Sequence, residues 1–201
     1  MHLFPLLVSA SFVAAGPVQT FPPLSSHRED YLRNGRANAC QVGSRTITQD
    51  AVNLTQTIAW DIGGVTSSDP VTFCHTVMRM DYGKDWQYAV TDIDWKSHVT
   101  TSDSTQITIQ LDFNFDQEAK INRFRWPIES GKDEPWKTHM RVPSPIYSAC
   151  GQNQALAFEW RVNFDSIKGK GGTGVASGSM GSQKKEGGHL KLNLVMKWKR
   201  C

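Results

Sequence analysis

Several chemical signatures are missing from this sequence. Its closest cysteines, Cys40 and Cys74, are 34 residues apart, so no short Cys-x-x-Cys metal pair exists. The Gly-x-Ser-x-Gly and His-Glu-x-x-His patterns of hydrolases and zinc proteases are absent, and the six histidines are dispersed. The sequence shows no amphipathic helix of convincing length, and no continuously apolar stretch follows the amino-terminal region. We therefore expect no metal site, no cofactor and no transmembrane segment.

The amino-terminal region predicts secretion. An apolar run ends in Val13-Ala14-Ala15, which predicts a signal peptide over residues 1–15 with cleavage after Ala15. Residues 16–37 are rich in proline, serine and charge, and we expect a flexible linker or propeptide there. The remaining residues, 38–201, have the size of one domain. The expected location is extracellular.

The four cysteines fit that compartment. An even number of cysteines behind a signal peptide predicts two disulfides. Three pairings are possible, and the sequence does not choose among them. We favour Cys40 with Cys74 and Cys150 with Cys201, because each pair would tie a terminal segment to an internal strand.

Large apolar residues occupy every second position over residues 107–115, 156–164 and 190–198, and the intervening positions are polar except for Ala157 and Val195. Period two places every large side chain on one face of a β-strand. Over residues 86–95 the alternation changes parity, and a β-bulge near Thr91-Asp92 would restore the register. Residues 123–136 hold two tryptophans and two prolines, which indicates a loop or short edge strands.

The fold class follows from these segments. Seven or eight strands separated by turn signals, without helices and with two disulfides, predict an all-β protein. The preferred architecture is an antiparallel β-sandwich, jelly-roll-like in its connections, and the alternative is a flattened barrel.

The charge is unevenly distributed along the chain. The formal net charge is +3, but residues 168–201 alone carry eight basic residues and one acidic residue, a balance of +7. A basic end could meet nucleic acid, anionic lipid or acidic polysaccharide. The preferred interpretation is a solvated strand face, because Lys191, Lys197 and Lys199 occupy outward positions where lysine discourages edge pairing. We expect no nucleic-acid partner.

Two aspartates stand out among the acidic residues. Asp92 and Asp94 are two residues apart on a strand and share a face. They could bind a hard cation such as calcium, or act with another acid such as Glu159 as a glycosidase pair. The alternative is that they cap the bulge by hydrogen bonds to neighbouring backbone.

Two tryptophans give a second candidate site. Trp126 and Trp136 lie in the proline-containing stretch, where an indole ring is harder to bury, and Arg123 and Arg125 flank them. Exposed rings could stack on sugars or anchor a protein partner. These four residues, with Asp92 and Asp94, are the predicted binding residues.

The sequence also contains one N-glycosylation sequon. It is Asn53-Leu54-Thr55, which predicts that Asn53 lies on the surface and carries a glycan.

Several motifs together resemble a family of small secreted fungal proteins with four cysteines, domain of unknown function 4360. They are Cys40 to Ser44, the strand around Cys74, Asp85 to Asp94, Ser148 to Gly151, and Lys197 to Cys201. The chain departs from the pattern at Gln41 and Ala149, where the family often has proline. The resemblance implies a secreted β-rich protein, sometimes nominated as a host-interaction effector or cell-surface component. It implies no catalytic residues.

These observations favour a secreted, disulfide-stabilised interaction protein that is not an enzyme, either effector-like or a binder of cell-wall carbohydrate. The expected partner is a wall polysaccharide or a surface protein of a host or competitor, and the expected state is a monomer. The alternative is a secreted β-sandwich enzyme that acts on polysaccharide through Asp92, Asp94 and Glu159.

Overall fold

The computed structural model describes residues 27–32, 44–68, 71–80, 82–115, 121–152, 154–167, 178–181 and 189–201. The predicted signal peptide and Cys40 lie outside these residues. The described part of the chain contains β-strands and no helix, and every strand pairing in it is antiparallel. The prediction of an all-β, antiparallel β-sandwich is confirmed.

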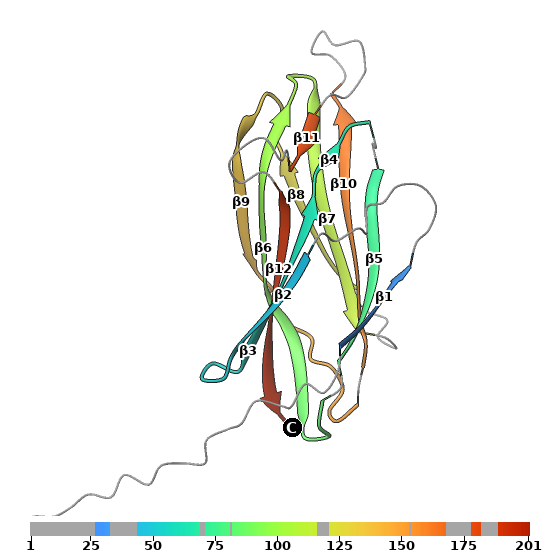
Figure 1. Ribbon diagram of the computed structural model, residues 1–201, viewed down its shortest axis with the longest axis vertical. Coiled ribbons are helices and arrows are strands. Elements are labelled where there is room, and N and C mark those ends of the chain that lie inside the picture. Colours follow the sequence, from blue (N-terminus) through green and yellow to red (C-terminus); the bar gives the residue numbers. More distant parts are fainter. Residues whose placement is uncertain are drawn as a thin grey trace, which may run out of the picture.

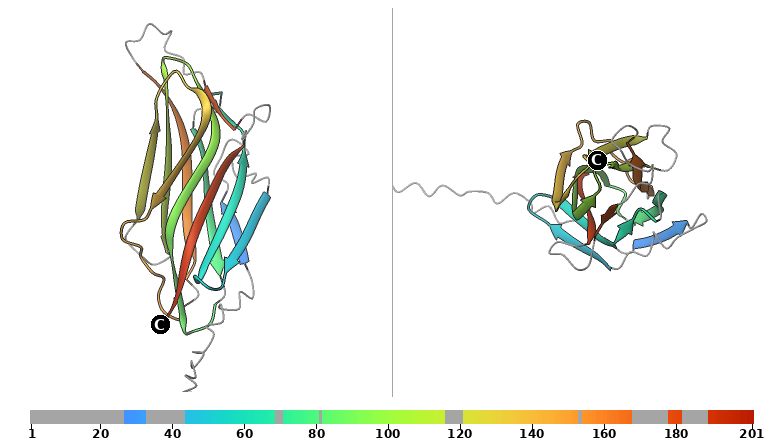
Figure 2. Two further views of the ribbon diagram at one scale, coloured as in Figure 1. Left: turned by 90° about the vertical axis from the view of Figure 1, so that its left-hand side faces the viewer. Right: turned by 90° about the horizontal axis from the view of Figure 1, so that it is seen from above.

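The strands form two sheets that face each other along the long axis of the molecule (Figures 1 and 2). Sheet A has the order β1 (His27–Leu32), β5 (Val71–Met80), β10 (Leu156–Ser166), β7 (Thr105–Phe115) and β8 (Asn122–Ile128). Sheet B begins with β2 (Ser44–Asp50), β3 (Thr55–Gly63), β12 (Leu190–Arg200) and β6 (Trp86–Thr101). Across β6 from β12 lies β9 (Asp133–Arg141), and the short strands β4 (Val65–Thr66) and β11 (Gly178–Met180) complete the sheet.

The connections between the sheets have a jelly-roll order. Without the four short or peripheral strands β1, β2, β4 and β11, the sheets read β5-β10-β7-β8 and β3-β12-β6-β9. Of the consecutive strands in this set, only β7 and β8 stay in the same sheet, while every other connection crosses between the sheets. Strands distant in sequence therefore lie side by side, which is how β3, β12, β6 and β9 come to share one surface.

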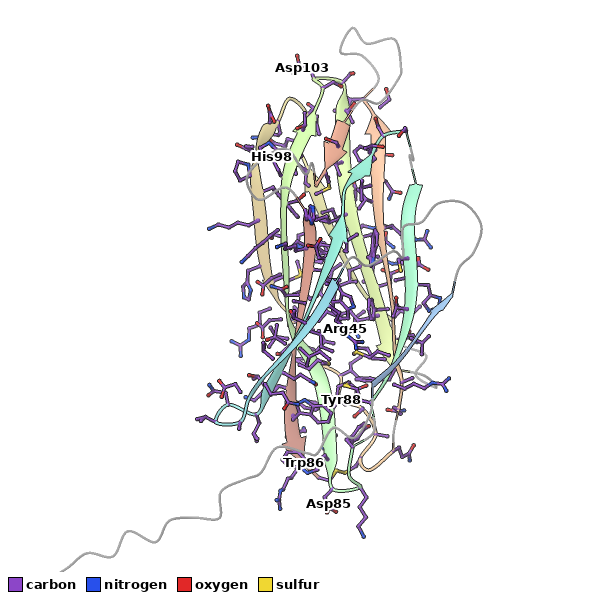
Figure 3. All side chains as sticks on the ribbon, viewed as in Figure 1. Arg45, Asp85, Trp86, Tyr88, His98 and Asp103 are labelled. Carbon is purple, nitrogen blue, oxygen red and sulfur yellow. A yellow bond between two sulfur atoms is a disulfide. The ribbon has the colours of Figure 1, made fainter. Side chains whose placement is uncertain are left out.

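The period-two alternation sets the core. The apolar positions of β7, β10 and β12 point between the sheets, and their polar positions point to solvent. Aromatic side chains fill much of the space, and Trp95, Trp160 and Trp198 are among the largest fully buried residues. Figure 3 shows Tyr88 between the sheets, and its ring meets Trp198 and Phe115 at centroid distances of 4.8 and 5.1 Å.

One part of the expected linker is a strand. Residues 27–32 form β1, which pairs with β5 from His27 opposite Met80 to Leu32 opposite His75. This strand lies within residues 16–37, and their assignment as a flexible linker or propeptide stays a prediction. An edge strand is held by backbone hydrogen bonds to one neighbour, so it can form without the alternating pattern that the sequence lacks there. Among the described residues, no helix has the length and apolarity needed to span a membrane.

One of the two favoured disulfides is present in the described residues. Cys150 and Cys201 are bonded, with their Cα atoms 5.9 Å apart. Cys74 is also disulfide-bonded, but Cys40, its expected partner, lies outside the described residues. The pairing of Cys40 with Cys74 therefore stays a prediction.

Candidate functional site

The outer face of sheet B carries the candidate site. Its solvent-facing residues are those that alternate with the core positions of β3, β12, β6 and β9. The strand registers align them in rows across the sheet. One row is Thr57, Val195, Asp92 and Arg141, and the next is Ala59, Asn193, Asp94 and His139. Residues more than 100 positions apart in sequence are thus neighbours on this face.

A β-bulge in β6 shapes this face. Val195 pairs with Asp92 while the next residue, Met196, pairs with Val90, so Thr91 is the extra residue. This confirms the predicted bulge. The Thr91 hydroxyl donates a hydrogen bond to the carbonyl of Val195 at 3.3 Å, and the Thr91 carbonyl accepts one from the amide of Val142 at 2.8 Å. Bulges re-aim side chains and are common beside functional sites.

The two predicted aspartates are close together and share one histidine. Asp94 Oδ1 lies 2.8 Å from Nδ1 of His139, and Asp92 Oδ1 lies 3.7 Å from Nε2 of the same ring. Both carboxylates are about three-tenths exposed, whereas the histidine side chain is 63% exposed. Hydrogen bonding to a cross-strand side chain, rather than capping of the bulge backbone, is the contact that the structure shows for Asp94.

A groove of about 910 Å³ crosses this face. Side chains from β3, β12, β6, β9 and the segment after β9 line it: Thr55, Thr91, Asp92, His139, Arg141, Val142, Pro143, Pro145, Tyr147 and Lys197. Two hydroxyls, a carboxylate, an imidazole and two cationic groups are thereby combined with one aromatic ring. Such convergence of a few polar groups and a ring is typical of a ligand site.

Residues 142–147 form one wall of the groove, and backbone hydrogen bonds hold this segment to β6. The amide of Val142 donates to Thr91, and the amide of Ser148 donates to the carbonyl of Tyr88 at 2.8 Å. The Ser148 hydroxyl oxygen in turn accepts a hydrogen bond from the backbone amide of Tyr88, with the two atoms 3.1 Å apart. Tyr147 is therefore held between fixed neighbours, and the ammonium group of Lys199 lies 3.6 Å from the centroid of its ring. That cation–π contact fixes the ring further.

The predicted tryptophan site is not on the surface. Trp126 is 7% exposed, and its ring packs edge-on against Trp95 with centroids 6.0 Å apart. Trp136 is half-buried and also packs against the core. The expectation that these rings are exposed is wrong, because β8 and β9 are edge strands whose alternation turns both indoles inward. The prolines mark sheet edges rather than a surface loop.

The arginines beside Trp126 lie on the outer face of sheet A. Arg123 forms two hydrogen bonds from Nε and one from Nη2 to the carboxylate of Asp112, and this contact raises the pKa of the guanidinium. Arg125 donates to the side-chain carbonyl of Gln110 at 2.9 Å. Both arginines are engaged within their own sheet and are remote from Asp92 and Asp94.

The proposed three-acid constellation is divided between the two sheets. Glu159 lies on the outer face of sheet A, hydrogen-bonded to Arg161, and lines a small pocket of about 220 Å³ there. Asp92 and Asp94 lie on the outer face of sheet B. A glycosidase needs its two carboxyl groups on either side of one bond. Glu159 therefore cannot act on the same bond as the two aspartates.

The histidines are also separated. His75 lines the pocket on sheet A, His98 is buried with Nε2 2.9 Å from Oδ1 of Asp133, and His139 pairs with Asp94. Within the described ranges no group of three or more metal-ligating side chains is arranged to hold a metal ion.

Asn53 lies at the tip of the β2–β3 hairpin. It is exposed, and its side-chain amide donates to Asp50 at 2.7 Å. Thr55, the hydroxyl residue of the same sequon, lines the groove. Glycosylation of Asn53 stays a prediction.

The family model described as "Domain of unknown function (DUF4360)" matches residues 38–201. The chain belongs to this family. A comparison with curated proteins found no match. Two solved structures show distant likeness. The structure of TmCBM61 in complex with beta-1,4-galactotriose is 6% identical in sequence to this chain, with a TM-score of 0.25, and the match covers 89% of this chain and 90% of TmCBM61. A chain in the structure of deformed wing virus, a honeybee pathogen, is 8% identical to this chain with a TM-score of 0.24, and the match covers 100% of this chain and 54% of the viral chain. At these TM-scores neither likeness bears on the argument.

Groove residues beyond Asp92 were not predicted from the sequence. Arg141 and Tyr147 belong to no motif, and Lys197 was predicted only as an outward residue of its strand; all three line one groove with Asp92 because β12, β6 and β9 are adjacent. The one available signal was the closely spaced pair Pro143 and Pro145, which marks an irregular segment beside a strand end.

Proposed function

We propose that this protein is a secreted, non-catalytic binding protein that holds a carbohydrate polymer in the groove on the outer face of sheet B. The observation that carries the proposal is the groove itself, which combines polar side chains from four strands with the tyrosine ring of the segment after β9. Sugars present hydroxyl groups at their edges and C–H groups on their faces. Thr55, Thr91 and Asp92 suit the first, and Tyr147 suits the second.

The size and position of the groove support a polymer as ligand. It extends across β3, β12, β6 and β9 to residues 142–147 and is not an enclosed chamber within the core. Its volume of about 910 Å³ lies near the upper end of ordinary ligand sites. A chain of several sugar units would fill such a site and continue beyond both ends.

The carboxylates favour binding over hydrolysis. Of the acidic residues with described side chains, Asp92 alone lines the groove, and its neighbour Asp94 is hydrogen-bonded to His139. Polysaccharide hydrolysis uses an acid and a second carboxylate on opposite sides of the scissile bond. The two aspartates instead lie side by side on one strand face, where they can accept hydrogen bonds from hydroxyl groups.

The disulfide supports an extracellular role. A bond between Cys150 and Cys201 would be reduced in the cytosol but persists in an oxidising compartment. It is compatible with the predicted signal peptide and with a protein that works at or outside the cell wall.

The test is retention of the secreted, oxidised protein on insoluble chitin, β-glucan, cellulose and plant wall material, with reducing sugar assayed in the supernatant. We expect retention on at least one polymer without sugar release. Arg141→Ala should lower the affinity about tenfold or more, while Arg79→Ala, which removes an exposed arginine from the outer face of sheet A, should not.

Two tyrosine variants separate stacking from hydrogen bonding. Tyr147→Phe should keep most of the affinity if the ring stacks on a sugar, and Tyr147→Ala should lose it. Release of sugar would establish an enzyme and refute the proposal. Retention that is equal in Arg141→Ala, Tyr147→Ala and the unmodified protein would place the binding site elsewhere.

A further inference from the structure

Three lysines stand side by side on the outer face of sheet B. Lys191 on β12 is the register partner of Lys96 on β6, and Lys96 is the register partner of Lys137 on β9. All three side chains are exposed. None of them forms an ion pair with any residue in the part of the chain that the structure describes. We call these three residues the lysine row.

The lysine row opposes folding. Like charges directly opposite each other on neighbouring strands are destabilising, and here two such pairs share Lys96. Asp61 on β3, the other register partner of Lys191, offsets the charge at one end of the row, but both register partners of Lys96 are lysines.

Protection of a sheet edge accounts for Lys137 on the edge strand β9 but not for Lys191 and Lys96. The expectation that Lys191 guards an edge strand is wrong, because β12 lies between β3 and β6. Lys96 is likewise on an interior strand, with β12 on one side and β9 on the other. Lysine discourages aggregation only where a strand has an unpaired edge. Edge protection therefore leaves Lys96 and Lys191 unexplained, and a ligand that carries negative charge would offset their repulsion.

The lysine row continues the groove. On β9 the outward residues run Lys137, His139 and Arg141, so the row lies roughly 13 Å along the strand from the groove lining at Arg141. On β12 the outward residues run from Lys191 to Lys197, which also lines the groove. One extended ligand could therefore contact both.

From this continuity we infer that the ligand is an acidic polysaccharide, whose carboxylate or sulfate groups are bound by the lysine row while its sugar rings occupy the groove. The inference rests on the proposed carbohydrate-binding function and adds the chemical class of the ligand. A lipid surface is disfavoured, since the large apolar side chains that are strongly exposed in the described part of the chain, Val52 in the β2–β3 turn and Ile121 before β8, are not on β12, β6 or β9. Single-stranded nucleic acid is disfavoured because its sites use several rings as stacking platforms, and this groove has one.

The experiment compares polygalacturonate, a sulfated galactan and neutral galactan as ligands of the secreted, oxidised protein. We expect affinity for at least one of the two anionic polymers to exceed that for the neutral polymer tenfold or more, and to fall as salt rises. The double variant Lys96→Gln with Lys191→Gln should remove most of this preference and leave affinity for the neutral polymer unchanged. A double variant with Lys96→Arg and Lys191→Arg should keep the preference.

The control has the same change in net charge. Arg79→Gln with Lys84→Gln removes two exposed cations outside this face and should leave the preference intact. The Lys96→Gln, Lys191→Gln variant should also unfold at the same or a higher temperature, because repulsion is relieved.

The possible results distinguish a failure of the acidic-ligand inference from a failure of the proposed carbohydrate binding. Equal binding of neutral and acidic polymers, or an equal loss in the control, would overturn the acidic ligand and leave carbohydrate binding standing. Failure of every polymer to bind would overturn both. Tighter binding to anionic lipid vesicles or to oligonucleotides than to any polysaccharide would assign the lysine row to a different partner and refute the inference.

Discussion

The carboxyl-terminal disulfide gives the most quantitative prediction. Cys150 and Cys201 are 51 residues apart in sequence, and replacing both by serine removes a closed loop from the unfolded chain. In the loop-entropy model, a loop of this length contributes about 4 kcal/mol at room temperature. We therefore expect the Cys150→Ser, Cys201→Ser variant to lose about 4 kcal/mol in the free energy of unfolding.

The folded state should survive this change because backbone hydrogen bonds hold the same two segments. The amide of Cys201 donates to the carbonyl of Asp85 at 2.9 Å, and the amide of Gly151 donates to Trp86 at 3.2 Å. Figure 3 places Asp85 and Trp86 at the end of the molecule where Figure 1 marks the carboxyl terminus. The lost stability should therefore come from a freer unfolded chain.

Urea unfolding at equilibrium measures both parts of this reasoning. The variant should keep the near-ultraviolet circular dichroism of the unmodified protein, show a larger m-value, and melt roughly 8–16 °C lower. Reduction of the unmodified protein is not an equivalent experiment, because Cys74 is also disulfide-bonded. A loss below about 1 kcal/mol, or a variant without native circular dichroism at low temperature, would refute the entropic account.

Three further predictions concern single positions. Gly151→Ala should lower the melting temperature clearly, because Gly151 has φ of 67° and an added Cβ would lie 2.3 Å from the carbonyl oxygen of Lys84. Trp126→Ala should lose about 3–5 kcal/mol in urea unfolding by leaving a cavity beside the core, and an unchanged stability would contradict its burial. Hydrogen bonds from the side chain and backbone of Asn53 hold the pKa of Asp50 below its ordinary value of 3.8. The stability from this contact should be present above pH 3.8 and lost as pH falls through the lowered pKa, and Asp50→Asn should abolish that part of the pH dependence measured by thermal melts.

The sequence predicted the strands that have one solvent-exposed face and one buried face. In β7, β10 and β12 the alternation alone identifies the buried positions, because period two has a single structural meaning over nine residues. The bulge at Thr91 was predictable for the same reason, since a change of parity between Val90 and Ile93 needs one extra residue.

Edge strands and the groove could not be predicted in the same way. The irregular composition around Trp126 and Trp136 comes from prolines at the edges of both sheets, and composition does not tell an edge strand from a surface loop. The groove needs knowledge of which strands are neighbours. Asp92 and Lys197 meet because β12 lies beside β6, and alternation carries no information about strand order.

The two outer faces of the sandwich serve as an internal comparison. On sheet A the register partners Asp112 and Glu159 also carry like charges, but Arg123 neutralises the first and Arg161 the second. At this pair on sheet A, the repulsion between the two carboxylates is therefore offset by an arginine beside each of them.

On sheet B, Asp61 lies opposite Lys191, but both register partners of Lys96 are lysines, although Lys96 stands on an interior strand where a single substitution could relieve the repulsion. The bulge in β6 is a second feature of this face that packing does not require. Without Thr91, residues 86–95 would alternate regularly and still turn Trp86, Tyr88, Val90, Ile93 and Trp95 toward the core. Packing therefore requires neither feature, and both lie on the face that holds the groove. The proposed binding of an external ligand accounts for the two together.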